Sequence, residues 1–162
     1  MNLQTLGALA ALALLTACAG EDRPMTTGTG AGMGTAVAIG SSSAGGTEED
    51  LKQNVGDRVY FDFDRALLRP DARATLDRQA AWLGKYAQVN VEIAGNCDER
   101  GTEEYNIALG QRRANTARTY LVAKGVSATR ITAISYGKDR PVAVGSNDAA
   151  WKQNRNAITE VK

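Results

Sequence analysis

Opposite charges flank a strand-to-helix corner in the second half of the chain. Asp98 lies in a polar turn that follows an alternating apolar pattern, and a long helical pattern comes after the turn. Asn106, Leu109 and Arg113 succeed one another at spacings of three and four residues, which places their side chains on one face of that helix. A carboxylate and a guanidinium on two walls of a cleft suit a ligand that carries both an ammonium and a carboxylate group.

The start of the helix strengthens this interpretation. The first helical turn, near residues 101–104, presents backbone amide groups whose partial positive charge favours an anion. A second interpretation is that Asp98 and Arg113 form a structural ion pair that closes the turn onto the helix. The charge pattern by itself favours the structural pair, so both interpretations stay open at this point.

The composition narrows the classes of function. The chain of 162 residues has 19 Lys and Arg against 18 Asp and Glu, a formal net charge of +1. Nucleic-acid binding relies on many phosphate contacts, so this balance argues against it. The sequence contains no histidine, which removes the commonest metal ligand and general base. We expect no metal, no cofactor and no nucleic-acid partner.

Two elements are expected before the corner. Alternating apolar residues predict a strand at residues 58–63, and Pro70 opens a predicted helix at residues 70–86. The apolar face of the strand consists of Val59, Phe61 and Phe63. The buried stripe of the helix consists of Leu76, Ala80 and Leu83. Trp82 neighbours this stripe, so we interpret it as core.

The remaining elements complete an α/β sandwich. They are strands at residues 89–97, 130–136 and 156–161, a long helix at residues 103–124 ended by Gly125, and a short helix at residues 147–154. The core face of the long helix is expected to be Ile107, Ala114, Ala117 and Leu121. That face leaves Arg113 at the margin of the sheet. Strands that alternate with helices predict helices packed on one small sheet.

A series of short motifs runs through the same region. They are YFDFD at residues 60–64, CDERGT at 97–102, YN at 105–106, LGQRRA at 109–114, KGVS at 124–127, SYGK at 135–138 and NR at 154–155. This series resembles the OmpA-like peptidoglycan-binding family, and in particular its peptidoglycan-associated lipoprotein branch. The resemblance covers roughly residues 55–162. It implies a mixed four-stranded sheet.

The resemblance also implies a ligand, the diaminopimelate of the peptidoglycan stem peptide, held without a covalent bond. In the family the turn aspartate takes the ligand's ammonium and the helix arginine takes its carboxylate, roles that fall on Asp98 and Arg113. The other positions that match pocket-lining residues of the family are Phe61, Asp62, Thr102, Asn106, Leu109 and Arg155. A surface charge is the alternative interpretation of Arg155.

Two residues depart from the family pattern. Asn96 stands where many relatives have histidine, and Asn156 stands where many have a second arginine. Asparagine still donates and accepts hydrogen bonds. We therefore expect altered contacts at these positions and retained binding.

The beginning of the chain predicts export and lipidation. The apolar run at residues 6–15 is too short to span a bilayer and suits the core of a signal peptide at residues 1–17. Leucine, threonine and alanine before Cys18 resemble a bacterial lipobox, although no Lys or Arg precedes the apolar run. Lipidation of Cys18 is the prediction, and an ordinary secretory signal with an incidental cysteine is the alternative. Residues 18–50, rich in Gly, Ser and Thr, are expected to be a flexible tether to a domain at residues 51–162.

The second cysteine, Cys97, continues the core face of its strand. We interpret it as a small buried hydrophobic residue, because nothing in the sequence establishes a basic neighbour that would lower its pKa.

The resemblance implies a location and partners. Ala19 follows Cys18 in place of the aspartate that the family associates with inner-membrane retention, which favours the outer membrane, facing the periplasm. The expected function is to join the outer membrane to peptidoglycan as part of the Tol-Pal system in envelope integrity and cell division. Its partners would then include Tol proteins such as the periplasmic propeller protein TolB. A wall-binding lipoprotein outside that system is the alternative.

A peptidoglycan-cleaving enzyme is the rival from another class. Its carboxylates would come from Asp98, Glu99, Glu103 and Glu104. Glycoside hydrolysis needs two carboxyl groups in contrasting environments that face each other across a cleft. Acidic residues in a first helical turn are explained more simply by the helix dipole. The prediction is a binding protein without enzymatic activity.

Overall fold

The computed structural model describes residues 45–162. The predicted signal peptide, Cys18 and the tether up to residue 44 lie outside the described residues. In chain order the elements are α1 (Glu48–Asp50), a π-helical turn (Leu51–Val55), β1 (Arg58–Tyr60), α2 (Pro70–Lys85), β2 (Val91–Asn96), α3 (Glu103–Ala123), a 3-10 turn (Ala128–Arg130), β3 (Ile131–Gly137), α4 (Asp148–Asn154) and β4 (Asn156–Val161).

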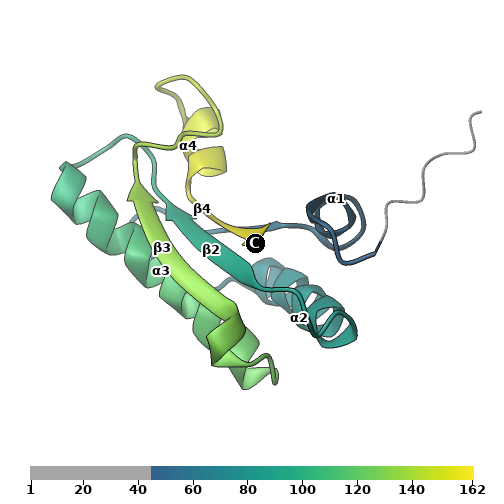
Figure 1. The fold of residues 1–162 in the computed structure, drawn as a ribbon. Helices are drawn as coiled ribbons and strands as arrows, with labels where there is room; N and C mark the ends of the chain where they lie inside the picture. Colours follow the sequence, from purple (N-terminus) through teal and green to yellow (C-terminus); the bar gives the residue numbers. More distant parts are fainter. Residues whose placement is uncertain (1–44) are drawn as a thin grey trace, which may run out of the picture. The chain divides into compact units, whose positions relative to one another are not determined.

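The four strands form one mixed sheet in the order β1-β4-β2-β3. β2 pairs in parallel with β3 and antiparallel with β4, and β4 pairs antiparallel with β1. Figure 1 shows α2 and α3 behind the sheet, on the same face. The predicted fold class, a small mixed four-stranded sheet with helices packed on it, is confirmed.

The core lies between this face of the sheet and the two long helices. Leu76 and Leu83 of α2 are buried in it, as the helical periodicity predicts, and Ala80 of the same stripe is half-buried against it. Trp82, which we interpreted as core, is buried as well. Two predicted core positions are wrong. Ile107 is 39% exposed and Phe63 is 58% exposed. The strand leaves the sheet after Tyr60, so alternation no longer directs Phe63 inward, while the buried face of α3 at that level is formed by Asn106 and Gly110.

Two glycines let α3 approach the sheet closely. A Cβ atom on Gly95 of β2 would lie 1.9 Å from the carbonyl oxygen of Gly110 on α3. A Cβ atom on Gly110 would lie 2.3 Å from Ser135 Oγ on β3. Neither distance is compatible with a side chain, so glycine is required at both positions. The first half of α3 therefore packs directly against β2 and β3 near the ends of these strands.

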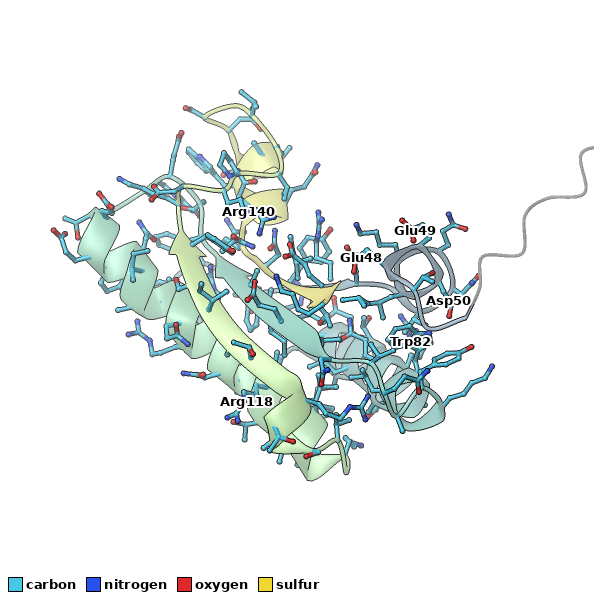
Figure 2. The ribbon with its side chains drawn as sticks, viewed as in Figure 1. Glu48, Glu49, Asp50, Trp82, Arg118 and Arg140 are labelled. Atoms are coloured by element: carbon cyan, nitrogen blue, oxygen red, sulfur yellow. The ribbon has the colours of Figure 1, made fainter. Side chains whose placement is uncertain are left out.

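The segment that contains α1 is held by hydrogen bonds to α2 and to the end of β4. Trp82 Nε1 and the Gly46 amide donate hydrogen bonds to Asp50 Oδ2 at 2.7 and 3.0 Å, and Figure 2 labels Asp50 and Trp82 side by side. Glu48 accepts a hydrogen bond from the amide of Val161 at 2.6 Å. Ordered contacts therefore begin before residue 51, where we predicted the domain to start. Within residues 45–162 no helix is both long and apolar enough to cross a membrane.

Candidate functional site

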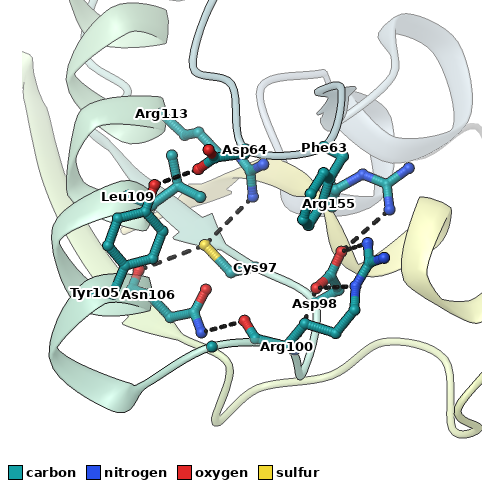
Figure 3. Close-up of a pocket in the computed structure, with 11 residues that line it drawn as sticks. Phe63, Asp64, Cys97, Asp98, Arg100, Tyr105, Asn106, Leu109, Arg113 and Arg155 are labelled. Atoms are coloured by element: carbon teal, nitrogen blue, oxygen red, sulfur yellow. Dashed lines mark hydrogen bonds and ion pairs between the residues drawn. The ribbon is translucent and has the colours of Figure 1, made fainter.

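A pocket of about 180 Å³ opens at the strand-to-helix corner (Figure 3). Four segments surround it: the loop after β1, the turn after β2, the first half of α3 and the residue after α4. Its walls are formed by Phe63, Asp64, Cys97, Asp98, Arg100, Gly101, Tyr105, Asn106, Leu109, Arg113 and Arg155. The corner predicted from charge and spacing is thus a real concavity that contains both Asp98 and Arg113.

Asp98 is 4% exposed and is held by two arginines. Arg100 donates from Nε to Oδ1 at 3.1 Å and from Nη2 to Oδ2 at 2.7 Å, a two-point contact. Arg155 donates from Nη1 to Oδ2 at 3.1 Å. Burial acts to raise the pKa of Asp98, but the hydrogen bonds from Arg100 and Arg155 outweigh it and hold that pKa below its ordinary value. Asp98 is therefore ionised at neutral pH.

Arg113 is 1% exposed and its guanidinium is bound almost entirely to backbone. Nε donates to the carbonyl oxygen of Arg65 at 2.9 Å, and Nη2 donates to that of Asp62 at 3.1 Å. Nη1 donates to the carbonyl oxygen of Asn96 at 2.7 Å and to Cys97 Sγ at 3.3 Å. Arg113 lies at the end of β2, where Asn96 is the last residue, and its side chain is buried there under the loop after β1.

Asp98 and Arg113 do not pair with each other. The ion pairs of Asp98 run to Arg100 and Arg155, and the side-chain hydrogen bonds of Arg113 run to three carbonyl groups and one thiol. The proposed structural ion pair between Asp98 and Arg113 is therefore absent among the described residues. The two charges belong to separate walls of one pocket (Figure 3).

The environment of Arg113 is poor in compensating charge. Burial lowers the pKa of this guanidinium, because the protein interior disfavours its positive charge. Carbonyl oxygens solvate the charge but do not neutralise it. An anionic group placed beside Arg113 would therefore compensate a charge that the carbonyl groups leave unneutralised.

The other predicted residues divide into two groups. Asn106 and Leu109 line the pocket, and so does Arg155, which is buried and is not a surface charge. Phe61 and Thr102 lie outside the pocket lining: Phe61 is buried beneath Arg113, and the Thr102 hydroxyl caps α3 by accepting a hydrogen bond from the Tyr105 amide.

Asp62 also lies outside the lining. Its carbonyl oxygen binds Arg113, while its carboxylate faces Arg69 at 3.6 Å.

Several pocket residues escaped the sequence analysis. Phe63 and Asp64 line the pocket in place of Phe61 and Asp62, two positions further along the same motif. Asp64 has φ of 55°, a left-handed backbone conformation that turns the chain back over the corner. Its carboxylate accepts a hydrogen bond from the Tyr105 hydroxyl and has no lysine or arginine partner within residues 45–162. The available signal for this turn in the sequence was Asp64 itself, because aspartate tolerates the left-handed conformation better than most residues.

Arg100 is a further residue that the sequence analysis missed. Its guanidinium lies between the rings of Phe63 and Trp151, 4.1 Å from each centroid. Helical spacing groups residues only within α3, which begins at Glu103, and Arg100 lies in the turn before it.

Cys97 is a buried thiol at the floor of the pocket. Burial raises the pKa of Cys97, and the nearby Arg113 offsets this only in part. The thiol donates to the carbonyl oxygen of Asn106 at 3.4 Å. The predicted burial of Cys97 is confirmed, and the structure adds a basic neighbour that the sequence did not establish, since Arg113 Nη1 lies 3.3 Å from the sulfur. No cluster of three or more His, Cys, Asp or Glu side chains within residues 45–162 could hold a metal ion.

Comparison with known proteins identifies the family. The model of the OmpA family matches residues 60–155. The chain is 48% identical over 145 residues to the peptidoglycan-associated lipoprotein of Rhizobium meliloti (strain 1021), which covers 90% of this chain and 80% of the relative. It is 45% identical over 156 residues to the peptidoglycan-associated lipoprotein of Mesorhizobium japonicum, covering 94% and 88%. The chain belongs to the OmpA family, a family without enzymatic activity.

Solved structures agree on the fold. The crystal structure of the peptidoglycan-associated lipoprotein from Burkholderia pseudomallei matches with a TM-score of 0.67 and 39% identity, over 71% of this chain and 99% of that one. The C-terminal domain of Helicobacter pylori MotB matches with a TM-score of 0.61 at 19% identity, over 65% and 84%. At that identity the second likeness concerns the fold alone.

Proposed function

We propose that this protein binds the stem peptide of peptidoglycan without a covalent bond and thereby joins a membrane to the cell wall. The observation that carries the proposal is that Asp98 and Arg113 stand on separate walls of one pocket without pairing. The likeness to the peptidoglycan-associated lipoproteins supports the choice of ligand. The ligand group is the amino-acid end of diaminopimelate, which carries an ammonium and a carboxylate on one carbon.

The charges of the pocket support a ligand of this kind. Among the residues that line it, Arg100, Arg113 and Arg155 are cationic, and Asp64 and Asp98 are anionic. A ligand with both signs of charge leaves fewer buried charges uncompensated than a purely cationic or purely anionic ligand does. In this assignment Arg113 receives the carboxylate and Asp98 the ammonium. Asn106 and Leu109 form the wall between them.

The size of the pocket limits what can enter. About 180 Å³ accommodates the end of one amino-acid side chain and not a disaccharide unit. The stem peptide would therefore enter by its diaminopimelate tip while the glycan strand stays outside.

Two measurements test the proposal. Purified protein should sediment with cell-wall sacculi and release no soluble fragments. Calorimetry with a diaminopimelate-containing stem tripeptide should give saturable binding, and Asp98→Asn should weaken it by at least about tenfold, since a charge-assisted hydrogen bond contributes roughly 1.5 to 3 kcal/mol. Failure to sediment, or unchanged affinity in Asp98→Asn, would refute the assignment.

The location and further partners belong to the same proposal. Likeness to lipoproteins supports a membrane-anchored envelope protein, and we propose the outer membrane, with Cys18 as the lipidated residue. We further propose that Tol proteins, including the propeller protein TolB, are partners in envelope integrity and cell division. Fractionation of membranes from cells that carry Cys18→Ser, and capture of Tol proteins from envelope extracts, test these two points separately.

A further inference from the structure

The four acceptor positions of the Asp98 carboxylate are all taken by hydrogen bonds. An ionised carboxylate offers about four lone-pair sites, two on each oxygen. Oδ1 accepts from the Arg100 amide at 3.2 Å and from Arg100 Nε at 3.1 Å. Oδ2 accepts from Arg100 Nη2 at 2.7 Å and from Arg155 Nη1 at 3.1 Å. A ligand ammonium that is to bind Asp98 must therefore replace a donor that is already there.

Arg155 is fixed in place. Its side chain is only 11% exposed, and Nε donates a second hydrogen bond to the carbonyl oxygen of Phe61 at 3.2 Å. Moving Arg155 would break that bond and would bury an unpaired carbonyl group. Arg155 is therefore the partner that Asp98 keeps.

Arg100 is the partner that can leave. Its side chain is 36% exposed, and its side-chain hydrogen bonds within the described residues all run to Asp98. The remaining contacts of its guanidinium are the ring faces of Phe63 and Trp151, which hold a cation without fixing its direction. Phe63 itself is largely exposed. Rotation of the Arg100 side chain into solvent removes hydrogen bonds from Asp98 alone, and Asp98 keeps the hydrogen bonds from Arg155 and from the Arg100 amide.

We propose that Arg100 is an internal competitor for the ligand's ammonium group: its guanidinium pairs with Asp98 and is exchanged for the ammonium when the stem peptide binds. The proposal rests on the function proposed above. It adds that Arg100 sets the affinity of the pocket for the stem peptide. Binding then replaces one ion pair with another, so the affinity is lower than two free charges would give. The exchange also keeps the buried carboxylate paired in both states.

Calorimetry with two stem tripeptides tests the proposal. One carries the free amino group on the diaminopimelate side chain, and in the other this amino group is acetylated. Arg100→Gln removes the competing charge while keeping a side chain of similar length. It should bind the free-amine tripeptide roughly tenfold more tightly than the wild type does, the effect expected of one charge-assisted hydrogen bond. Binding of the acetylated tripeptide should not improve.

Arg140→Gln is the matched control. Arg140 also pairs with a carboxylate, Glu160, at 3.1 Å, and also stacks on a ring, that of Tyr136 at 4.7 Å. It is not part of the pocket lining. Its replacement reports the general effect of removing one positive charge and should leave both affinities unchanged. Arg100→Lys, which keeps the charge but loses the two-point contact, should fall between Arg100→Gln and the wild type.

Equal or weaker binding of the free-amine tripeptide by a folded Arg100→Gln would overturn the proposal, as would an equal gain for both tripeptides. Thermal unfolding of each variant verifies that it is folded, and Arg100→Lys carries the test if Arg100→Gln is not. If the wild type fails to bind the free-amine tripeptide at all, the proposed function fails together with the exchange. If the wild type binds and only the gain is missing, the exchange alone is refuted.

Discussion

Asn96 Nδ2 donates a hydrogen bond to Asn156 Oδ1 at 2.8 Å, and both side chains are fully buried. The two residues stand on neighbouring antiparallel strands, one step beyond the pair Gly95 and Ala157. They are also the two positions at which we expected altered contacts from the sequence. The next residues on each side, Cys97–Asp98 and Arg155, lead into the pocket. The hydrogen bond between Asn96 and Asn156 therefore joins the two segments that carry Asp98 and Arg155, which form an ion pair with each other.

This pair predicts coupled effects on stability. Asn96→Ala and Asn156→Ala should each lower the free energy of unfolding by about 1 to 2 kcal/mol, because each leaves a buried polar group without its partner. The double variant should lose less than the sum, with a coupling of at least about 0.5 kcal/mol. Urea denaturation of the four proteins measures the coupling, and additive losses would show that the two amides act independently.

Arg113 is predicted to be a structural residue as well as a binding residue. Arg113→Ala removes the donors to the carbonyl groups of Arg65, Asp62 and Asn96. Leaving buried acceptors unsatisfied costs about 1 to 3 kcal/mol each, so we expect a loss of about 3 kcal/mol or more in the free energy of unfolding.

Arg112→Ala is the control for this loss. Arg112 is the preceding residue on the helix, is exposed and lies over the ring of Tyr105 at 5.9 Å. Its removal should change stability by no more than about 0.5 kcal/mol. Similar losses for the two variants in urea denaturation would contradict the structural role of Arg113.

The space around two helical glycines predicts opposite effects of substitution by alanine. Gly110 of α3 is packed against the sheet, whereas Gly84 of α2 has open space around it. Gly110→Ala should destabilise by about 1 to 3 kcal/mol, since its Cβ atom would lie 2.8 Å from the Gly95 carbonyl oxygen as well as against Ser135. Gly84→Ala should stabilise by up to about 1 kcal/mol, because nothing lies within 4 Å of a Cβ atom there and alanine favours the helix. Thermal melting of both variants checks the signs, and destabilisation by Gly84→Ala would be the unexpected result.

The pKa of Asp98 predicts a pH window. That pKa is lowered in the folded protein, so ionised Asp98 contributes stability that is fully present above the pKa of the unfolded chain, about 3.9. The contribution is lost as the pH falls through the lower pKa of the folded state. The stability difference between the wild type and Asp98→Asn should therefore stay constant from pH 8 to pH 5 and shrink below about pH 4. Urea denaturation across this range measures it, and a difference that already shrinks above pH 5 would contradict the direction of the shift.

The fold could be predicted from the sequence because its signals are local. Pro70 at the start of α2 and the period-two pattern of β2 each specify one element without reference to the rest of the chain. The partners of Asp98 could not be predicted in this way. Arg100 is selected by a turn conformation, and Arg155 is brought from the far end of the chain by the pairing of β4 with β2.

The pocket lining shows the same division. Spacing on one helix correctly placed Asn106, Leu109 and Arg113 together. In the loop after β1, the predicted pocket residues were Phe61 and Asp62, whereas the structure has Phe63 and Asp64, two positions further on. The alternating pattern continues in the sequence, but the strand ends at Tyr60 and Asp64 takes a left-handed conformation. Periodicity predicts which face a residue occupies only as long as the element continues.

The most direct test of the binding site is a crystal structure of the protein, without its predicted signal peptide, in complex with a diaminopimelate-containing muropeptide. We predict that the ligand's carboxylate lies against Arg113 and its ammonium against Asp98, inside the pocket at the corner. A diaminopimelate tip docked elsewhere, for example in the groove between Leu67 and Tyr120, with the corner pocket empty, would contradict the account.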